Sequence, residues 1–128
     1  MKILLDTCTF LWLITDDPQL SPKALSIFID PDNDVYLSAV STWEIAIKHA
    51  IGRLPLPGEP EDFIPLQRKQ HSIEPLPLDE EAALFLPKLP QLHNDPFDRM
   101  LICQAIVEGM AILTPDKNIS RYSIRVVW

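Results

Sequence analysis

The amino-acid sequence predicts an α/β fold in which a central, mostly parallel sheet of four to five short strands is flanked by helices. Residues 2–6, 35–37 and 111–113 are short apolar runs without alternation, which is typical of strands buried on both faces. Helical segments separate these runs, and strands that alternate with helices favour parallel pairing through right-handed crossovers. The chain has 128 residues, enough for a sizeable core. We expect a single domain over residues 1–128, because no internal repeat or second domain is visible.

The composition is typical of a soluble globular protein, with 47% hydrophobic and 23% charged residues. The longest apolar run, residues 10–14, is too short to span a bilayer, and the segment before Asp6 leaves no room for a signal peptide. We therefore expect a cytoplasmic protein that contacts no membrane. The net charge of −7 argues against broad binding of nucleic acid through a basic face, but not against an enzyme that grips nucleic acid through bound cations. Cys8 and Cys103 follow no metal spacing and lie among apolar residues, so we expect buried, reduced thiols.

Helices follow the first two strands. Residues 7–13 continue as a helix with Phe10 turned inward, and a second helix follows Ser21 and runs to about residue 29. A third helix spans about residues 41–51. Its apolar side is expected to hold four residues: Trp43, Ile47, Ala50 and Leu54.

Prolines punctuate residues 54–92, which we expect to form a helical arm or lid beside the sheet, or a dimer surface. Helices within this region begin at Pro60 and Asp79, and residues 72–74 form a minor strand. The last strand, residues 123–127, is predicted at an edge of the sheet because a charged residue interrupts its apolar residues.

A carboxylate lies on the apolar side of the helix predicted after residue 95. Asp95 is a natural N-cap, and Pro96 suits the first helical position. Helical spacing then joins one acid to four apolar residues: Asp98, Leu101, Ile102, Ala105 and Ile106. An aspartate in the first turn complements the helix dipole by about 0.3–1 kcal/mol, but it does so equally well from the solvent face. The dipole therefore does not explain the inward position of Asp98.

Glu44 also has a structural explanation. Residues 41–44 fit a capping box, and Glu44 with Lys48 is a favourable pair one helical turn apart. Taken alone, Glu44 is a structural residue.

Topology nevertheless brings four acids to one edge of the predicted sheet, because strand ends and helix starts share that edge. They follow or flank the three buried strands: Asp6, Glu44, Asp98 and Asp116. Two carboxylates ~4 Å apart repel by about 4 kcal/mol at an effective dielectric of 20, and few cationic residues lie near in sequence. The acids are therefore either further apart than the topology suggests, or they hold a divalent cation. Oxygen ligands without a His or Cys cluster favour Mg²⁺, with Mn²⁺ as a possible substitute, and such a site activates water for attack on a phosphodiester.

Four blocks of the sequence resemble the PIN-domain ribonucleases, and more narrowly the VapC-type toxins of bacterial toxin–antitoxin pairs. The blocks are residues 4–7 (Leu-Leu-Asp-Thr), 41–48 (Ser-Thr-Trp-Glu-Ile-Ala-Ile-Lys), 95–99 (Asp-Pro-Phe-Asp-Arg) and 114–116 (Thr-Pro-Asp). The resemblance implies a PIN-like domain and a Mg²⁺-dependent endoribonuclease that cleaves RNA. It also implies a small antitoxin that plugs the acidic site. We further expect a homodimer. The helices between residues 60 and 86 are a candidate for part of the antitoxin groove.

The same resemblance assigns the residues of the site. Asp6, Glu44, Asp98 and Asp116 match the acidic quartet that is catalytic and binds metal. Asp95 also matches the family pattern, although its capping role explains it. Two hydroxyl residues are expected to orient a metal-bound water or a carboxylate, although hydroxyls at strand ends are usually local caps: Thr7 and Thr114.

Two other functions remain open at this point. A phosphatase with an aspartyl nucleophile also begins with a strand ending in Asp, but it usually has a second acid two residues later, where this chain has Cys8. A catalytically inactive PIN-like module that binds RNA or a protein is the other alternative.

Overall fold

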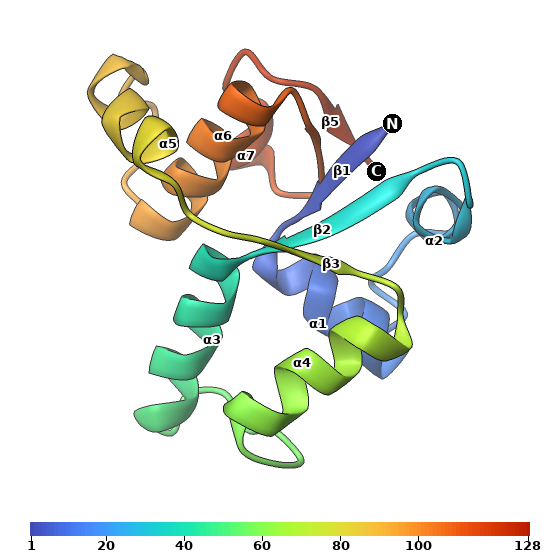
Figure 1. Cartoon of the computed structure of the whole chain (residues 1–128). Helices are drawn as coiled ribbons and strands as arrows, with labels where there is room; N and C mark the ends of the chain where they lie inside the picture. Colours follow the sequence, from blue (N-terminus) through green and yellow to red (C-terminus); the bar gives the residue numbers. More distant parts are fainter.

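The computed structural model describes all 128 residues and contains one five-stranded sheet in which every neighbouring pair of strands is parallel (Figure 1). The strand order is β3-β2-β1-β4-β5. The strands are β1 Lys2–Leu5, β2 Asp34–Ser38, β3 Glu74–Leu76, β4 Ala111–Leu113 and β5 Val126–Val127. The predicted fold class and the parallel sheet are confirmed.

Seven α-helices and one 3₁₀ turn surround the sheet. They are α1 Thr7–Thr15, α2 Pro22–Ile29, α3 Ala39–Ala50, α4 Pro60–Gln70, α5 Glu80–Phe85, η1 Leu86–Lys88, α6 Pro96–Glu108 and α7 Lys117–Ser120. Figure 1 shows α5, α6 and α7 on one side of the sheet, and α1, α2 and α4 on the other. None of these helices has both the length and the apolar character that a membrane span requires.

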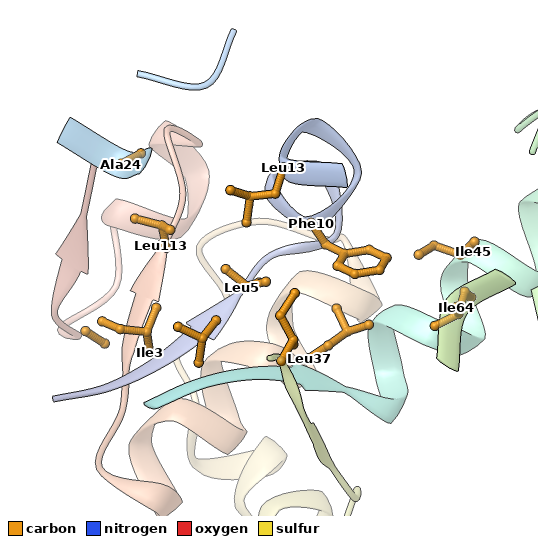
Figure 2. Close-up of a cluster of buried hydrophobic side chains, with 12 residues drawn as sticks. Ile3, Leu5, Phe10, Leu13, Ala24, Leu37, Ile45, Ile64 and Leu113 are labelled. Atoms are coloured by element: carbon orange, nitrogen blue, oxygen red, sulfur yellow. The ribbon is translucent and has the colours of Figure 1, made fainter. Parts of the chain in front are cut away.

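Alternating residues of the central strands lie in two separate hydrophobic cores, one on each face of the sheet. Ile3 and Leu5 of β1 face α1, α2 and α4, and Leu4 between them faces α6 and α7. All three residues have no exposed surface. Figure 2 shows the first core, where the Phe10 ring points from α1 toward Ile45 of α3. The strands are therefore covered on both faces, which explains why their sequences are continuously apolar.

Helix α3 begins earlier than predicted and presents a different face to the core. Ser38, the last residue of β2, caps it by accepting a hydrogen bond from Val40 N at 2.9 Å, so residues 41–44 do not form the predicted capping box. The buried residues of this helix are Val40, Ser41, Glu44 and Ile45. The predicted apolar side was wrong, because Trp43 and Ile47 are 56% and 39% exposed.

Four further details differ from the sequence-based expectation. Strand β3 starts at Glu74 because Ser72 turns the chain with a φ of +56°. The short helix α7 was not predicted. Ile106, expected in the core, is 37% exposed, because α6 buries the stripe of its neighbours Leu101, Ile102 and Ala105 instead. Cys103 is buried as expected, but Cys8 is exposed at the start of α1, and both cysteines are free.

Residues 54–92 contribute to the sheet and to both cores. Ile64 of α4 is 2% exposed in the first core, β3 pairs with β2, and Leu89 is 7% exposed in the second core. Movement of this segment as an arm or lid stays a prediction.

Replacing Phe10 with alanine should lower the free energy of unfolding by about 3–5 kcal/mol, because a buried ring leaves a cavity that its rigid neighbours cannot fill. Phe10 has no exposed surface, whereas Leu84 on α5 is 66% exposed. Urea unfolding of Phe10→Ala and of the control Leu84→Ala measures both changes. The control should stay within about 0.5 kcal/mol of the wild type, and an equally small effect of Phe10→Ala would contradict the packing of Figure 2.

Candidate active site

Asp6 lies where β1 ends and is tied to the strand beside it. The register pairs Leu5 with Leu113, so the next residues, Asp6 and Thr114, are neighbours. Asp6 Oδ1 caps α1 by accepting from Thr9 N at 2.7 Å, and Oδ2 accepts a short hydrogen bond from the Thr114 hydroxyl. Asp6 is only 5% exposed, so both its oxygens are fixed inside the protein.

Glu44 is held from two sides in the second turn of α3, not in the first turn as the sequence predicted. Thr7 Oγ1 lies 2.7 Å from Glu44 Oε1 and 3.0 Å from Ser41 Oγ. A hydroxyl has one proton, so Thr7 donates to the carboxylate and accepts from Ser41. Lys48 donates to Glu44 Oε2, which forms the predicted pair one turn apart and raises the pKa of Lys48. The hydroxyl pair thus links the start of α1 to α3.

Asp98 lies in the first turn of α6, as predicted, with 20% of its side chain exposed. Its Oδ2 is 3.3 Å from His93 Nε2, and no protein group bonds its Oδ1. Asp95 caps the same helix by accepting from Phe97 N at 2.9 Å and Asp98 N at 3.0 Å. The capping role expected of Asp95 is confirmed.

Asp116 follows β4 and caps α7, with Oδ1 accepting from Asn118 N at 2.8 Å. Its own N–H donates to Thr114 Oγ1 at 3.0 Å. Thr114 therefore binds Asp6 through its proton and the Asp116 backbone through its oxygen, and both predicted hydroxyl residues contact a carboxylate of the quartet.

The charges of several acids act on one another at this edge of the sheet. Burial raises the pKa of Asp6 above its usual range, and the charge of Asp116 adds to the rise. Burial also raises the pKa of Asp98 to about 6, with further rises from Asp95 and Asp116 that His93 partly offsets. Although Cys8 as a residue is exposed, partial burial raises the pKa of its thiol to about 11, and the charges of Asp6, Glu44 and Asp98 contribute. The charge of each of the four acids thus shifts the pKa of at least one other group.

The donor set has the chemistry of a Mg²⁺ or Mn²⁺ site, although no three Asp, Glu, His or Cys side chains are close enough together to hold an ion as they stand. Asp98 and Asp116 each keep one carboxylate oxygen without a protein partner. Asp6 and Glu44 use both oxygens in hydrogen bonds. These oxygen donors suit a hard divalent cation, and holding one would require the side chains to come closer together.

Three residues beside Asp98 had no role in the sequence-based prediction. His93, Arg99 and Tyr122 form hydrogen bonds behind this carboxylate. The proximity of His93 to Asp98, five residues apart in the sequence, could have indicated a contact between them. Tyr122 lies 29 residues from His93, and no local pattern connects the two.

Comparison with known proteins places the chain among proteins with this fold. The family model of the PIN domain matches residues 3–124. Ribonuclease VapC16 of Mycobacterium tuberculosis (strain ATCC 25618 / H37Rv) is 35% identical over 66 residues, which cover 48% of this chain and 47% of that protein. The chain thus spans about half the length of this relative.

Solved structures show the same fold at low sequence identity. VapBC2 from Rickettsia felis, bound to a DNA fragment from its promoter, aligns over 99% of this chain and 98% of that chain with a TM-score of 0.74 and 14% identity. DNA-bound VapBC from Salmonella typhimurium aligns over 99% and 97% of the two chains, with a TM-score of 0.69 and 22% identity.

Ionisation of Asp98 should destabilise the metal-free protein. The folded chain holds the proton of Asp98 up to a pKa of about 6, above the ordinary 3.8, so the free energy of unfolding falls as the pH rises between these values. Urea unfolding measured from about pH 4 to about pH 7 compares Asp98→Asn with the wild type. As the pH rises, the free energy of unfolding of Asp98→Asn should increase relative to that of the wild type, by on the order of 2–3 kcal/mol in total. The exposed Asp32, whose side chain bonds nothing, is the control, and Asp32→Asn should show no such trend. A constant difference between Asp98→Asn and the wild type would contradict the crowding of the acids.

Proposed function

This chain belongs to the PIN-domain family, and from that membership we propose that it is a Mg²⁺-dependent endoribonuclease of the VapC type, the toxin of a toxin–antitoxin pair. The observation that supports the proposal is the electrostatic link between acids that follow the strands or begin a helix: the charge of Asp116 raises the pKa of both Asp6 and Asp98. Such repulsion favours a site that binds a cation. The likeness to a ribonuclease over about half the chain supports RNA as the substrate.

The side chains have distinct roles in this proposal. Asp6, Asp98, Asp116 and Glu44 would hold Mg²⁺, or Mn²⁺ in its place, which supplies activation of water and stabilisation of the leaving oxygen when bound. Thr114 orients Asp6, and Thr7 fixes Glu44, so that the two most buried acids keep their direction. Asp95 acts indirectly, because it holds the first turn of α6 that carries Asp98.

The partner that we propose is a small antitoxin that inserts a basic side chain among the acids. Arginine suits this role because its planar fork pairs with a carboxylate through two hydrogen bonds. Residues of α1 and of the segment 54–67 line an apolar hollow of about 490 Å³ that suits the flanking residues: among them Leu11, Trp12, Leu54, Leu56 and Phe63. The solved structures that share this fold include VapBC complexes, which supports such a partner. Homodimerisation and a cytoplasmic location stay predictions.

Cleavage of RNA should require both the metal and Asp98. With Mg²⁺ the wild-type chain should cut a labelled RNA, and with EDTA it should not. Asp98→Asn should reduce the rate by at least about a hundredfold, because it removes a charge that holds the cation. Gel assays of the wild type, Asp98→Asn and the control Asp32→Asn provide the measurement. Mg²⁺-independent cleavage, or a full rate in Asp98→Asn, would overturn the proposal. An intact wild type that binds RNA without cutting it would favour the inactive module.

Metal binding should also be visible without RNA. A cation that binds only the folded chain raises the free energy of unfolding by RT ln(1 + [L]/Kd), which is ~2.7 kcal/mol at a hundred times Kd. The melting temperature should rise with increasing Mg²⁺ or Mn²⁺ for the wild type and for Asp32→Asn. It should rise much less for Asp98→Asn. A wild-type melting temperature that millimolar metal leaves unchanged would count against a cation site.

A further inference from the structure

Asp98 is backed by a chain of hydrogen bonds that the proposed reaction does not use. His93 Nε2 lies 3.3 Å from Asp98 Oδ2, and His93 Nδ1 lies 2.8 Å from the Tyr122 hydroxyl. The same hydroxyl receives Arg99 Nη1 at 3.0 Å and the His93 backbone N–H at 3.3 Å. Arg99 Nη1 also donates to the Pro90 carbonyl at 2.8 Å. We name these three residues, His93, Tyr122 and Arg99, the Asp98 relay.

Counting protons along the relay fixes which nitrogen of the neutral His93 ring carries the proton. Arg99 and the backbone N–H can only donate, so they take both lone pairs of the Tyr122 oxygen. The one proton of that hydroxyl must then point to His93 Nδ1, which acts as the acceptor. The remaining ring proton therefore sits on Nε2 and is donated to Asp98 Oδ2.

Burial keeps this arrangement in place. Tyr122 is 4% and Arg99 8% exposed, and the His93 side chain is 10% exposed. Arg99 pairs with no carboxylate, so the Tyr122 hydroxyl and the Pro90 carbonyl are its hydrogen-bond acceptors. These hydrogen bonds thus favour a single tautomer of the neutral ring.

We propose that His93 is a positioning residue that holds Asp98 through a fixed Nε2–H tautomer, with Tyr122 and Arg99 setting that tautomer. The relay restrains Oδ2 of Asp98 and leaves Oδ1 without a protein partner, which is the oxygen a cation can take. His93 itself is no ligand, because Nδ1 accepts from Tyr122 and Nε2 carries the proton. This role toward a cation rests on the proposed function, whereas the tautomer does not.

Nitrogen-15 NMR of the metal-free protein reads the tautomer directly. The chain has three histidines, and His49→Gln and His71→Gln identify their ring signals by loss. At a pH where the ring of His93 is neutral, the wild type should show an unprotonated Nδ1 and a protonated Nε2. Tyr122→Phe removes the hydroxyl that selects this form, so the signals of His93 should move toward a mixture of tautomers. A neutral wild-type ring that carries its proton on Nδ1 would overturn the relay.

Calorimetry with Mg²⁺ and Mn²⁺ tests the positioning role without any RNA. His93→Ala should weaken metal binding by about 10–100-fold, the usual cost of losing a group that orients a ligand. His93→Gln supplies an amide N–H in place of Nε2–H and should recover most of that loss. The control His71→Ala removes a ring whose Nδ1 contacts only Gln67 O, and it should bind metal as the wild type does. Urea unfolding of each variant confirms that it is folded.

The outcomes separate the two proposals. Metal affinity of folded His93→Ala equal to that of the wild type would overturn the positioning role, even if the chain cleaves RNA. Loss of affinity that His93→Gln does not recover would also overturn it, because the donated proton would not be the cause. A wild type with the expected tautomer that binds neither metal would overturn the proposed function, and with it the role of the relay toward a cation.

Discussion

Mutual repulsion among carboxylates at one edge of a parallel sheet is the constraint on which the rest of this structure depends. Five strands that run the same way bring every strand end and helix start together, and four acids occupy those positions. The fold tolerates them because each has a specific partner: a threonine hydroxyl at Asp6 and at Glu44, a lysine at Glu44, a histidine at Asp98 and the Asn118 backbone N–H at Asp116. Donors of this kind hold a charge in place without removing it.

The fold class and the position of Asp6 at the carboxyl end of β1 could be predicted because both follow from topology. Continuous apolar strands indicate a sheet covered on both faces, and an acid directly after such a strand, as at Asp6, has only one edge on which to lie. Asp98 was also accessible, because the helical period placed a carboxylate on the side of the apolar residues that pack against the sheet. In these cases the position along an element determines the position in space.

The details that failed depend on contacts between distant segments. The period of α3 allows two stripes, and the buried one carries Ser41 and Glu44 because Thr7 of α1 bonds both. Trp43 is left outside, where it packs edge-on against Phe97 of α6 at 5.0 Å between ring centroids. Cys8 follows the same logic, since Phe10 and Leu13 of the same helix turn to the core while Cys8 is exposed. Local pattern measures how apolar a segment is, but partners across the fold decide which stripe is buried.

The hydrogen bond from Thr114 to Asp6 has a consequence for the order in which this protein comes into being. It joins residues 108 positions apart. The hydrogen bonds of Thr7 with Ser41 and Glu44, and that between His93 and Tyr122, also close long loops. On the ribosome, β1 and its carboxylate emerge first but stay without their neighbouring strand β4 until nearly all of the chain has been translated. Asp6 therefore lacks the Thr114 hydroxyl during most of synthesis, and the acidic edge cannot be complete before translation reaches the last tenth of the chain. A chain stalled before β4 would possess Asp6, Glu44 and Asp98 without Asp116 and without the strand that holds Asp6.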